Sequence, residues 1–309
     1  MKKQSLILVV IAVILLVIYI FSQRSTPVKR SADYLVKIDS AAISKVEILN
    51  EDQHVILEKH GDEWWMTYPV EYPANPRFGE DMSAKLSDLK IENLISQQPD
   101  KQEKFEVSDS SGISVTVQAG KEPITIIMGK ISEGYQHTYM RLLDSDNIYL
   151  VKGVFRSYFS RNAKDWRDKN ITKYNKEDFI GYTLTYPDKS MELTKIDTGW
   201  VAKIGNEEFV AKKSIVKRIS NLLSNLNCFD FVDTLDTEKY DFSKPAFQLN
   251  VKTVTDQFAI RLLPEDEEAE KYILEKDGAL THFLIYKSTA NALMKDFEEF
   301  RPDPEEEKK

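Results

Sequence analysis

The residue types that most often carry chemistry in proteins are present in this chain, but they are not spaced as sites. The four histidines fall in separate predicted elements, at His54, His60, His137 and His282. The spacing of His54 and His60 is not one at which zinc ligands recur. The acidic clusters at 230–241 and 265–270 lack the alternating ligands and distal glutamate of a calcium-binding loop. The sequence therefore predicts no metal site and no cofactor.

Nucleophile motifs give no catalytic candidate either. The chain has no GxSxG, no SxxK and no glycine-rich phosphate loop. The single cysteine, Cys228, has apolar neighbours, and we expect it to be a buried core thiol. Paired carboxylates that cleave a glycosidic bond follow no sequence spacing, so a glycosidase stays open as an alternative. We predict no catalytic residues and a protein that is not an enzyme.

One polar and aromatic cluster stands out, the segment Asp165-Trp166-Arg167-Asp168-Lys169. Trp and Arg are enriched in the hot spots of protein interfaces, so Trp166, Arg167 and Asp168 are candidates for a recognition surface. The alternative is a clasp, in which Trp166 fills a seam between two parts of the chain and Arg167 pairs with a carboxylate. Its place in a connector favours the clasp. Arg141, at an alternating strand position, is a further candidate, and a rim ion pair is expected there.

Behind these residues lies a pattern of short strands that occurs twice. Apolar residues alternate with polar ones from 46 to 66, a helix-like face follows at 82–89, and strands return from 113 to 154. The same order of elements recurs in the second half. Matching positions lie 133 to 136 residues apart, at Val46 and Tyr182, Leu57 and Leu193, Trp64 and Trp200, Val115 and Leu249, and Tyr139 and Tyr272. A spacing that drifts at loops indicates duplication followed by loop deletions.

The expected fold class is α+β. It comprises two tandem duplicated units, each a mainly antiparallel sheet with one main helix, preceded by one N-terminal transmembrane helix. An antiparallel sheet has one apolar face to cover, and the helix of each unit would cover it. Trp64 and Trp200 are predicted to be structural residues that fill the space between sheet and helix.

The N-terminus predicts a membrane anchor. Residues 6–21 read LILVVIAVILLVIYIF and carry no charge, which favours insertion by on the order of −5 to −10 kcal/mol. The residues that follow make a poor cleavage site, so we expect an uncleaved anchor and not a removed signal peptide. A dibasic start at Lys2 and Lys3 is the usual layout of a signal anchor. We place the bulk of the chain in the periplasm, on the inner membrane, with the inverted topology as the alternative.

The charge of the chain excludes one class of partner. The formal net charge is −8, and every acidic residue lies beyond the predicted anchor. Such a surface repels the phosphates of nucleic acids. We predict no nucleic-acid partner and a membrane contact through the N-terminal helix.

Short motifs in the first half resemble a known bacterial family. They are the hairpin Tyr139-Met140-Arg141 with Ile148 to Val151, the Asp165 to Lys169 segment, and the lysine and loop before Trp64. Together they resemble the domain of unknown function 4340 family. That resemblance implies a membrane-anchored protein, often encoded beside ABC-type transporter or gliding-motility components, for which no catalytic residues are assigned. It therefore also implies protein partners in a membrane transport complex.

These observations predict seven segments. They are a cytoplasmic N-terminus at 1–5, a transmembrane anchor at 6–22, a tether at 23–38, a first unit at 39–161, a connector at 162–177, a second unit at 178–298 and an acidic tail at 299–309. The expected function is a non-enzymatic envelope protein that serves as an accessory or assembly module of an ABC-type transport or gliding-like system. The alternative is an envelope glycan-binding protein or hydrolase that uses a cleft between the two units.

Overall fold

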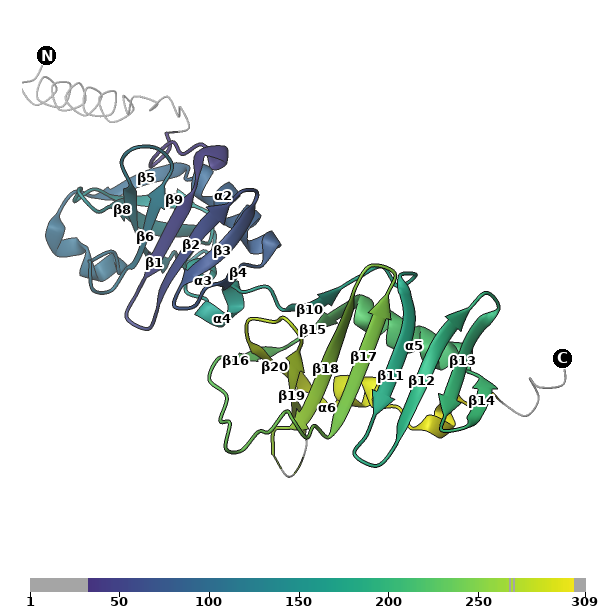
Figure 1. The fold of residues 1–309 in the computed structure, drawn as a ribbon. Coiled ribbons are helices and arrows are strands. Elements are labelled where there is room, and N and C mark those ends of the chain that lie inside the picture. The colour runs from purple at the N-terminus through teal and green to yellow at the C-terminus, as the bar shows by residue number, and fades with distance from the viewer. Residues whose placement is uncertain (1–32, 267, 269, 303–309) are drawn as a thin grey trace, which may run out of the picture. The chain divides into compact units, whose positions relative to one another are not determined.

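A computed structural model of the chain describes residues 33–302 apart from 267 and 269 (Figure 1). Within that part of the chain, no helix has the length and apolar content needed to span a bilayer. The anchor predicted at 6–22 lies outside the described residues, as do residues 1–5, most of the predicted tether and the end of the predicted tail.

Two nine-stranded sheets account for most of the described residues. The order of the first is β4-β3-β2-β1-β6-β7-β8-β9-β5 and that of the second is β14-β13-β12-β11-β17-β18-β19-β20-β16. The contacts of the chain group it into two compact units, one with residues up to 52 and 81–160, the other with 53–80 and 161 onward. The expectation of mainly antiparallel sheets with few helices is confirmed.

The strands of the first sheet are short and end at turns. They are β1 (Lys45–Leu49), β2 (His54–His60), β3 (Glu63–Tyr68), β4 (Tyr72–Pro73), β5 (Ile91–Ser96), β6 (Ile113–Gln118), β7 (Ile124–Ile131), β8 (His137–Leu142) and β9 (Ile148–Lys152). The helical segments of this half are η1 (Ser40–Ala42), α2 (Pro76–Ser87), η2 (Pro99–Lys101), η3 (Glu103–Phe105) and α3 (Arg156–Phe159).

The second sheet has the same number of strands. They are β11 (Phe179–Thr185), β12 (Ser190–Ile196), β13 (Gly199–Ile204), β14 (Glu207–Val210), β16 (Asp230–Val232), β17 (Phe247–Thr253), β18 (Gln257–Pro264), β19 (Lys271–Lys276) and β20 (His282–Tyr286). Around it lie α4 (Ala163–Trp166), α5 (Lys213–Ser224), α6 (Lys287–Leu293) and η4 (Phe297–Phe300), with the small pair β10 (Asn170–Lys173) and β15 (Asn225–Asn227).

Taken in chain order, the two sheets have one topology. Four strands are followed by a helix of 12 residues, α2 or α5, then by a strand that takes the last place in the sheet order, and then by a run of four strands. The register agrees as well, because Val46 lies opposite Val117 and Tyr182 lies opposite Val251. The helix boundaries in both halves follow from amphipathic runs, and α2 begins at Pro76, a favoured first helical residue.

The register corrects one predicted match. Met128 of the first sheet and Leu262 of the second occupy equivalent positions, two residues after the partners of Val115 and Leu249. Met128 pairs with Met140, and Leu262 pairs with Leu274. Tyr139 therefore corresponds to Ile273 and not to Tyr272. Since side chains alternate between the faces of a strand, a slip of one residue would exchange the two faces.

Both predicted structural tryptophans lie where strand and helix meet. Trp64 is buried on β3, and a Cβ placed on Gly79 of α2 would overlap its indole ring. Trp200 on β13 is half-buried and stacks on Tyr182 at a ring distance of 5.2 Å. The Tyr182 hydroxyl in turn bonds Ser220 of α5 at 2.8 Å. In the first half Gly79 lets α2 approach Trp64 closely, and in the second half the Tyr182–Ser220 hydrogen bond joins the sheet to α5.

Candidate functional site around Trp166 and Arg167

Trp166 ends the short helix α4 and is fully buried. Its main-chain carbonyl accepts a hydrogen bond from the N–H of Asn75 at 2.8 Å, just before α2. Its indole meets Phe78 edge to face at 6.3 Å, and the guanidinium of Arg161 lies over the indole at 4.8 Å. All of these residues belong to the second unit. The side chain is therefore a packing element with no face left for a ligand.

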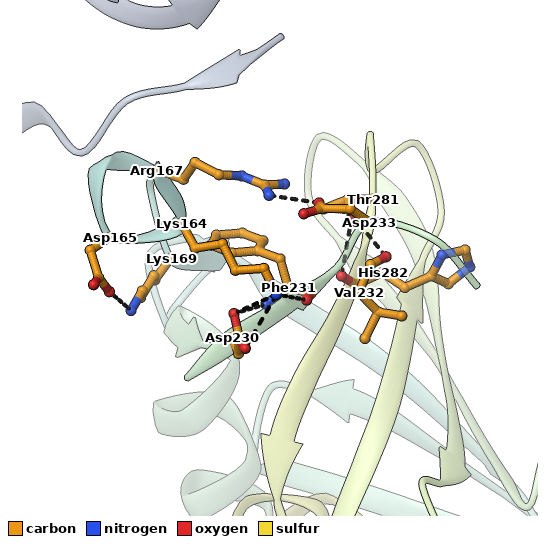
Figure 2. Close-up of polar contacts among 10 residues, drawn as sticks. All are labelled: Lys164, Asp165, Arg167, Lys169, Asp230, Phe231, Val232, Asp233, Thr281 and His282. Carbon is orange, nitrogen blue, oxygen red and sulfur yellow. Dashed lines mark hydrogen bonds and ion pairs between the residues drawn. The ribbon is translucent and has the colours of Figure 1, made fainter. Parts of the chain in front are cut away.

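Arg167 is buried between two aromatic rings. Its guanidinium carbon lies 4.3 Å from the ring centre of Tyr72 on β4 and 3.7 Å from that of Phe231 on β16. Its Nη1 donates to the carboxylate of Asp233 at 2.6 Å (Figure 2). Burial raises the pKa of Tyr72 to about 12, although the neighbouring Arg167 charge opposes that rise. A charge in this setting is retained because both its ion pair and its ring contacts compensate lost hydration.

The other charged residues of the segment also bond within the protein. Figure 2 shows Lys164 reaching β16, where its Nζ lies 3.2 Å from the Asp230 carboxylate and 2.9 Å from the Phe231 carbonyl. Asp165 pairs with Lys169 at 2.9 Å. Asp168 accepts the N–H of Asn170 at 3.1 Å through its carboxylate. Asp165, Asp168 and Lys169 are thus held by contacts close in sequence, whereas Lys164 and Arg167 bond to residues 230–233, far along the chain.

A hollow of about 460 Å³ borders Asp233, with Glu275, Thr281 and His282 in its lining. Thr281 donates to the carbonyl of Val232 at 3.3 Å, and His282 lies 3.6 Å from Glu275. Among the described residues, no group of three or more His, Cys, Asp or Glu side chains is arranged to hold a metal ion. The hollow is polar and open, and nothing in it positions a reacting group.

Arg141 belongs to the first unit and is buried on β8. Its Nη1 donates to the carbonyl of Leu143 at 2.8 Å, its Nε donates to the carbonyl of Val107, and its Nη2 pairs with Asp109. In the second sheet the corresponding residue is Glu275, which pairs with Arg261 at 2.7 Å. Arg141 therefore braces a loop against a hairpin within the first unit, whereas Arg167 belongs to the second unit.

A family model for a domain of unknown function, DUF4340, matches residues 64–245. The chain belongs to this family. Neither the comparison with curated proteins nor that with solved structures finds a match. The part of the chain assigned to DUF4340 includes Trp64, Arg141, Trp166, Arg167 and Trp200, so the motifs that resembled the family fall inside or at the edge of it.

A second copy of the Trp166–Arg167 arrangement is completed by Phe300 and Arg301, which lie beyond the DUF4340 match. The carbonyl of Phe300 accepts the N–H of Lys212, just before α5, at 2.7 Å. Phe300 is fully buried at the end of η4, as Trp166 is at the end of α4. The next residue, Arg301, lies over the ring of Phe209 on β14 at 4.6 Å. We call Tyr72, Trp166 and Arg167 the first clamp, and Phe209, Phe300 and Arg301 the second clamp.

The second clamp falls where the sequence predicted an acidic tail at 299–309. One signal in the sequence is the aromatic–Arg pair at 300–301, which matches 166–167 at a spacing of 134 residues. The acidic residues and prolines around that pair obscure it. The capping residue gives a stronger signal, since Asp296 accepts the N–H of Glu298 at 3.0 Å and starts η4.

Proposed function

We propose that the two sheets descend from one ancestral unit by duplication. The proposal is supported by one strand order, one 12-residue helix in the same place and two clamps with the same main-chain hydrogen bond. Coincidence between unrelated antiparallel sheets accounts for a similar strand count, but not for a matching register together with matching clamps. The apolar run at 6–22 would precede both units as a single membrane anchor.

The chain would act as a non-enzymatic, membrane-anchored envelope protein. Its role would be that of an accessory or assembly module of an ABC-type transport or gliding-like system, with its bulk in the periplasm. The observation that carries this proposal is the repetition of one nine-stranded unit. A repeated unit gives a membrane-tethered protein two comparable surfaces for partners. The buried charges Arg141 and Arg167 support it too, since both are engaged in packing.

Affinity purification from membranes tests this role. The full-length protein would be tagged at its C-terminus, cross-linked in cells and purified from detergent extract. A transporter permease or its ATPase should be enriched over a control bait that carries residues 1–32 on an unrelated periplasmic protein. Recovery of the full-length chain alone, with both baits equally expressed, would count against the accessory role.

The periplasmic placement has its own test. Protease added to spheroplasts should digest the described part of the chain, while a cytoplasmic marker protein stays intact. Protection of the chain until the membrane is permeabilised would show the inverted topology.

A polar hollow on the second sheet favours a second candidate function, binding of an envelope glycan. The hollow has a volume of about 750 Å³, and its lining includes Thr183, Glu192, Thr194, Asn250 and Lys252. Hydroxyl, amide and charged groups of this kind bond sugar hydroxyls. Calorimetric titration with soluble peptidoglycan fragments, compared between wild type and Asn250→Ala, tests it. Equal heats for the two proteins, or no heat for either, would dismiss this candidate.

A further inference from the structure

The two clamps differ in what lies on them. The first clamp is covered by Phe231, which is 2% exposed and meets Tyr72 edge to face at 5.3 Å. The Arg167 side chain is likewise 2% exposed. The second clamp is open by comparison, since the Arg301 side chain is 34% exposed, and the ring that the described residues place on it is that of Phe209. The covered first clamp therefore indicates which kind of side chain would pack on the exposed second clamp.

The positive charge of Arg301 in the second clamp is balanced by two neighbouring glutamates of the same unit. Arg301 donates to Glu207 of β14 through two nitrogens, at 2.7 and 3.0 Å, and to Glu298 at 2.9 Å. The guanidinium is thus held over Phe209 by three hydrogen bonds, and 34% of the side chain stays exposed. A guanidinium stacks on an aromatic ring, as Arg167 does on Phe231, and its planar face also packs against aliphatic side chains through van der Waals contact.

The strand that covers the first clamp has a counterpart elsewhere in the chain. β16 carries Phe231 and takes the last place in the second sheet, and β5 takes the last place in the first. Phe231 pairs with Phe283 of β20, and Leu94 pairs with Tyr149 of β9. Leu94 therefore corresponds to Phe231, and Ser96, which pairs with Ile148, corresponds to Val232, which pairs with His282; Ile95 lies between them at a register shift of β5.

Unlike Phe231, these β5 residues face solvent. Leu94 is 48% exposed and Ile95 is 36% exposed, on a strand at the edge of its sheet. Two neighbouring apolar side chains on an edge strand form a typical place for another chain to pack. The chain thus has an uncovered clamp at one position and an uncovered clamp-binding strand at another.

We propose that copies of this chain associate head to tail, with the second clamp of one copy packed on β5 of the next. Leu94 would take the place over Arg301 that Phe231 takes over Arg167. The polar neighbours are compatible as well. Beside the first clamp, Lys164 pairs with Asp230. In the proposed contact Glu298 takes the place of Lys164 and Asn93 takes that of Asp230, so the Asn93 amide donates to the Glu298 carboxylate. A contact between two different surfaces leaves one of each surface unpaired in a dimer, so further copies add to it and build either a closed ring or an open chain. This inference does not depend on the accessory role.

Cross-linking between separately tagged copies tests the contact. One full-length variant carries Ile95→Cys and the other Val210→Cys, which lies beside Phe209 on β14 and is 63% exposed. Both leave Leu94 and Arg301 unchanged. Mixed in detergent and treated with a short bismaleimide, they should give a mixed dimer on the order of tenfold above background, since docking raises the effective concentration of the two thiols. Tyr135→Cys with Val254→Cys, exposed sites away from both surfaces, sets that background.

Two further results decide the inference. Leu94→Arg, added to the Ile95→Cys variant, brings a like charge to Arg301 and should lower the mixed dimer to background. Because Leu94 is half exposed, this substitution leaves the fold in place, and an unchanged denaturation midpoint confirms that. A mixed dimer no stronger than the control pair overturns the proposal, and so does an Ile95→Cys variant that cross-links to itself as well as to Val210→Cys.

Discussion

Arg167 and Asp233 form an ion pair at 2.6 Å in which the guanidinium is 2% exposed and the carboxylate 33% exposed. Water can therefore solvate the Asp233 carboxylate if Arg167 is removed, but it cannot reach the Arg167 guanidinium if Asp233 is removed. Loss of the carboxylate leaves a buried cation, whereas loss of the guanidinium leaves a carboxylate that water and the Thr281 hydroxyl can reach.

From this asymmetry we predict that Asp233→Ala costs more than Arg167→Met. Asp233→Ala should lower the free energy of unfolding by about 2 to 4 kcal/mol, and Arg167→Met by about 1 kcal/mol, because methionine fills the space between the rings. Urea denaturation of the full-length protein in detergent, followed by tryptophan fluorescence, measures both. The double variant should resemble Arg167→Met alone, and a strictly additive loss would contradict the prediction.

Gly79 of α2 carries a second prediction. Alanine normally stabilises a helix by about 1 kcal/mol relative to glycine, but here its Cβ would overlap the Trp64 indole. We expect Gly79→Ala to destabilise the protein by about 1 to 3 kcal/mol through this overlap. Glu80→Ala, at an exposed position of the same helix, is the matched control and should be near neutral. If Gly79→Ala raises the denaturation midpoint, Trp64 does not pack on the helix as described.

Much of the fold was accessible from the sequence because each strand alternates. The strands β11 and β17 were predicted from the repeated strand pattern that contains Tyr182 and Leu249, and the structure pairs them antiparallel. The helices α2 and α5 were found for the same reason, from a repeated apolar face. Predictions of this kind use signals that extend over six or more residues.

The sequence identified only some residues of the clamps, for a physical reason. Trp166 and Arg167 drew attention by residue type, but their partners Tyr72 and Phe231 lie on strands of two and three residues, too short for any period to show. Phe300 and Arg301 were assigned to a tail because the acidic residues around them favour a solvated end. The pairing of an aromatic–Arg dipeptide with the main chain before a helix depends on contacts distant in sequence, which no local pattern encodes.

Cys228 gives a prediction about reactivity. Burial raises the pKa of its thiol to about 12, and the nearby Lys169 opposes that rise only in part. At pH 8 the thiolate fraction is then very small, and the thiolate is the reactive form. Iodoacetamide should leave the native protein unlabelled over a period in which it labels the urea-unfolded chain completely. Mass spectrometry of the Cys228 peptide reports this, and equal labelling in the two states would contradict the buried position.

The pH dependence of stability should show the contribution of Asp296, the residue that caps η4. Two contacts lower the pKa of its carboxyl, first the N–H of Glu298 and then the ammonium of Lys189. A carboxyl whose pKa is lower in the folded state stabilises the protein above its unfolded pKa, near 3.9, and loses that effect as the pH falls through the folded value.

Asp296→Asn should therefore be less stable than wild type at pH 7, and the difference should shrink as the pH approaches 3. Because η4 buries Phe300 of the second clamp, the same change should weaken the packing of Arg301 on Phe209. Denaturation midpoints measured from pH 7 to pH 3 give the comparison, with Asp197→Asn, an exposed turn residue, as the control. Parallel curves for wild type and Asp296→Asn over that range would show that the cap does not lower the pKa of this carboxyl.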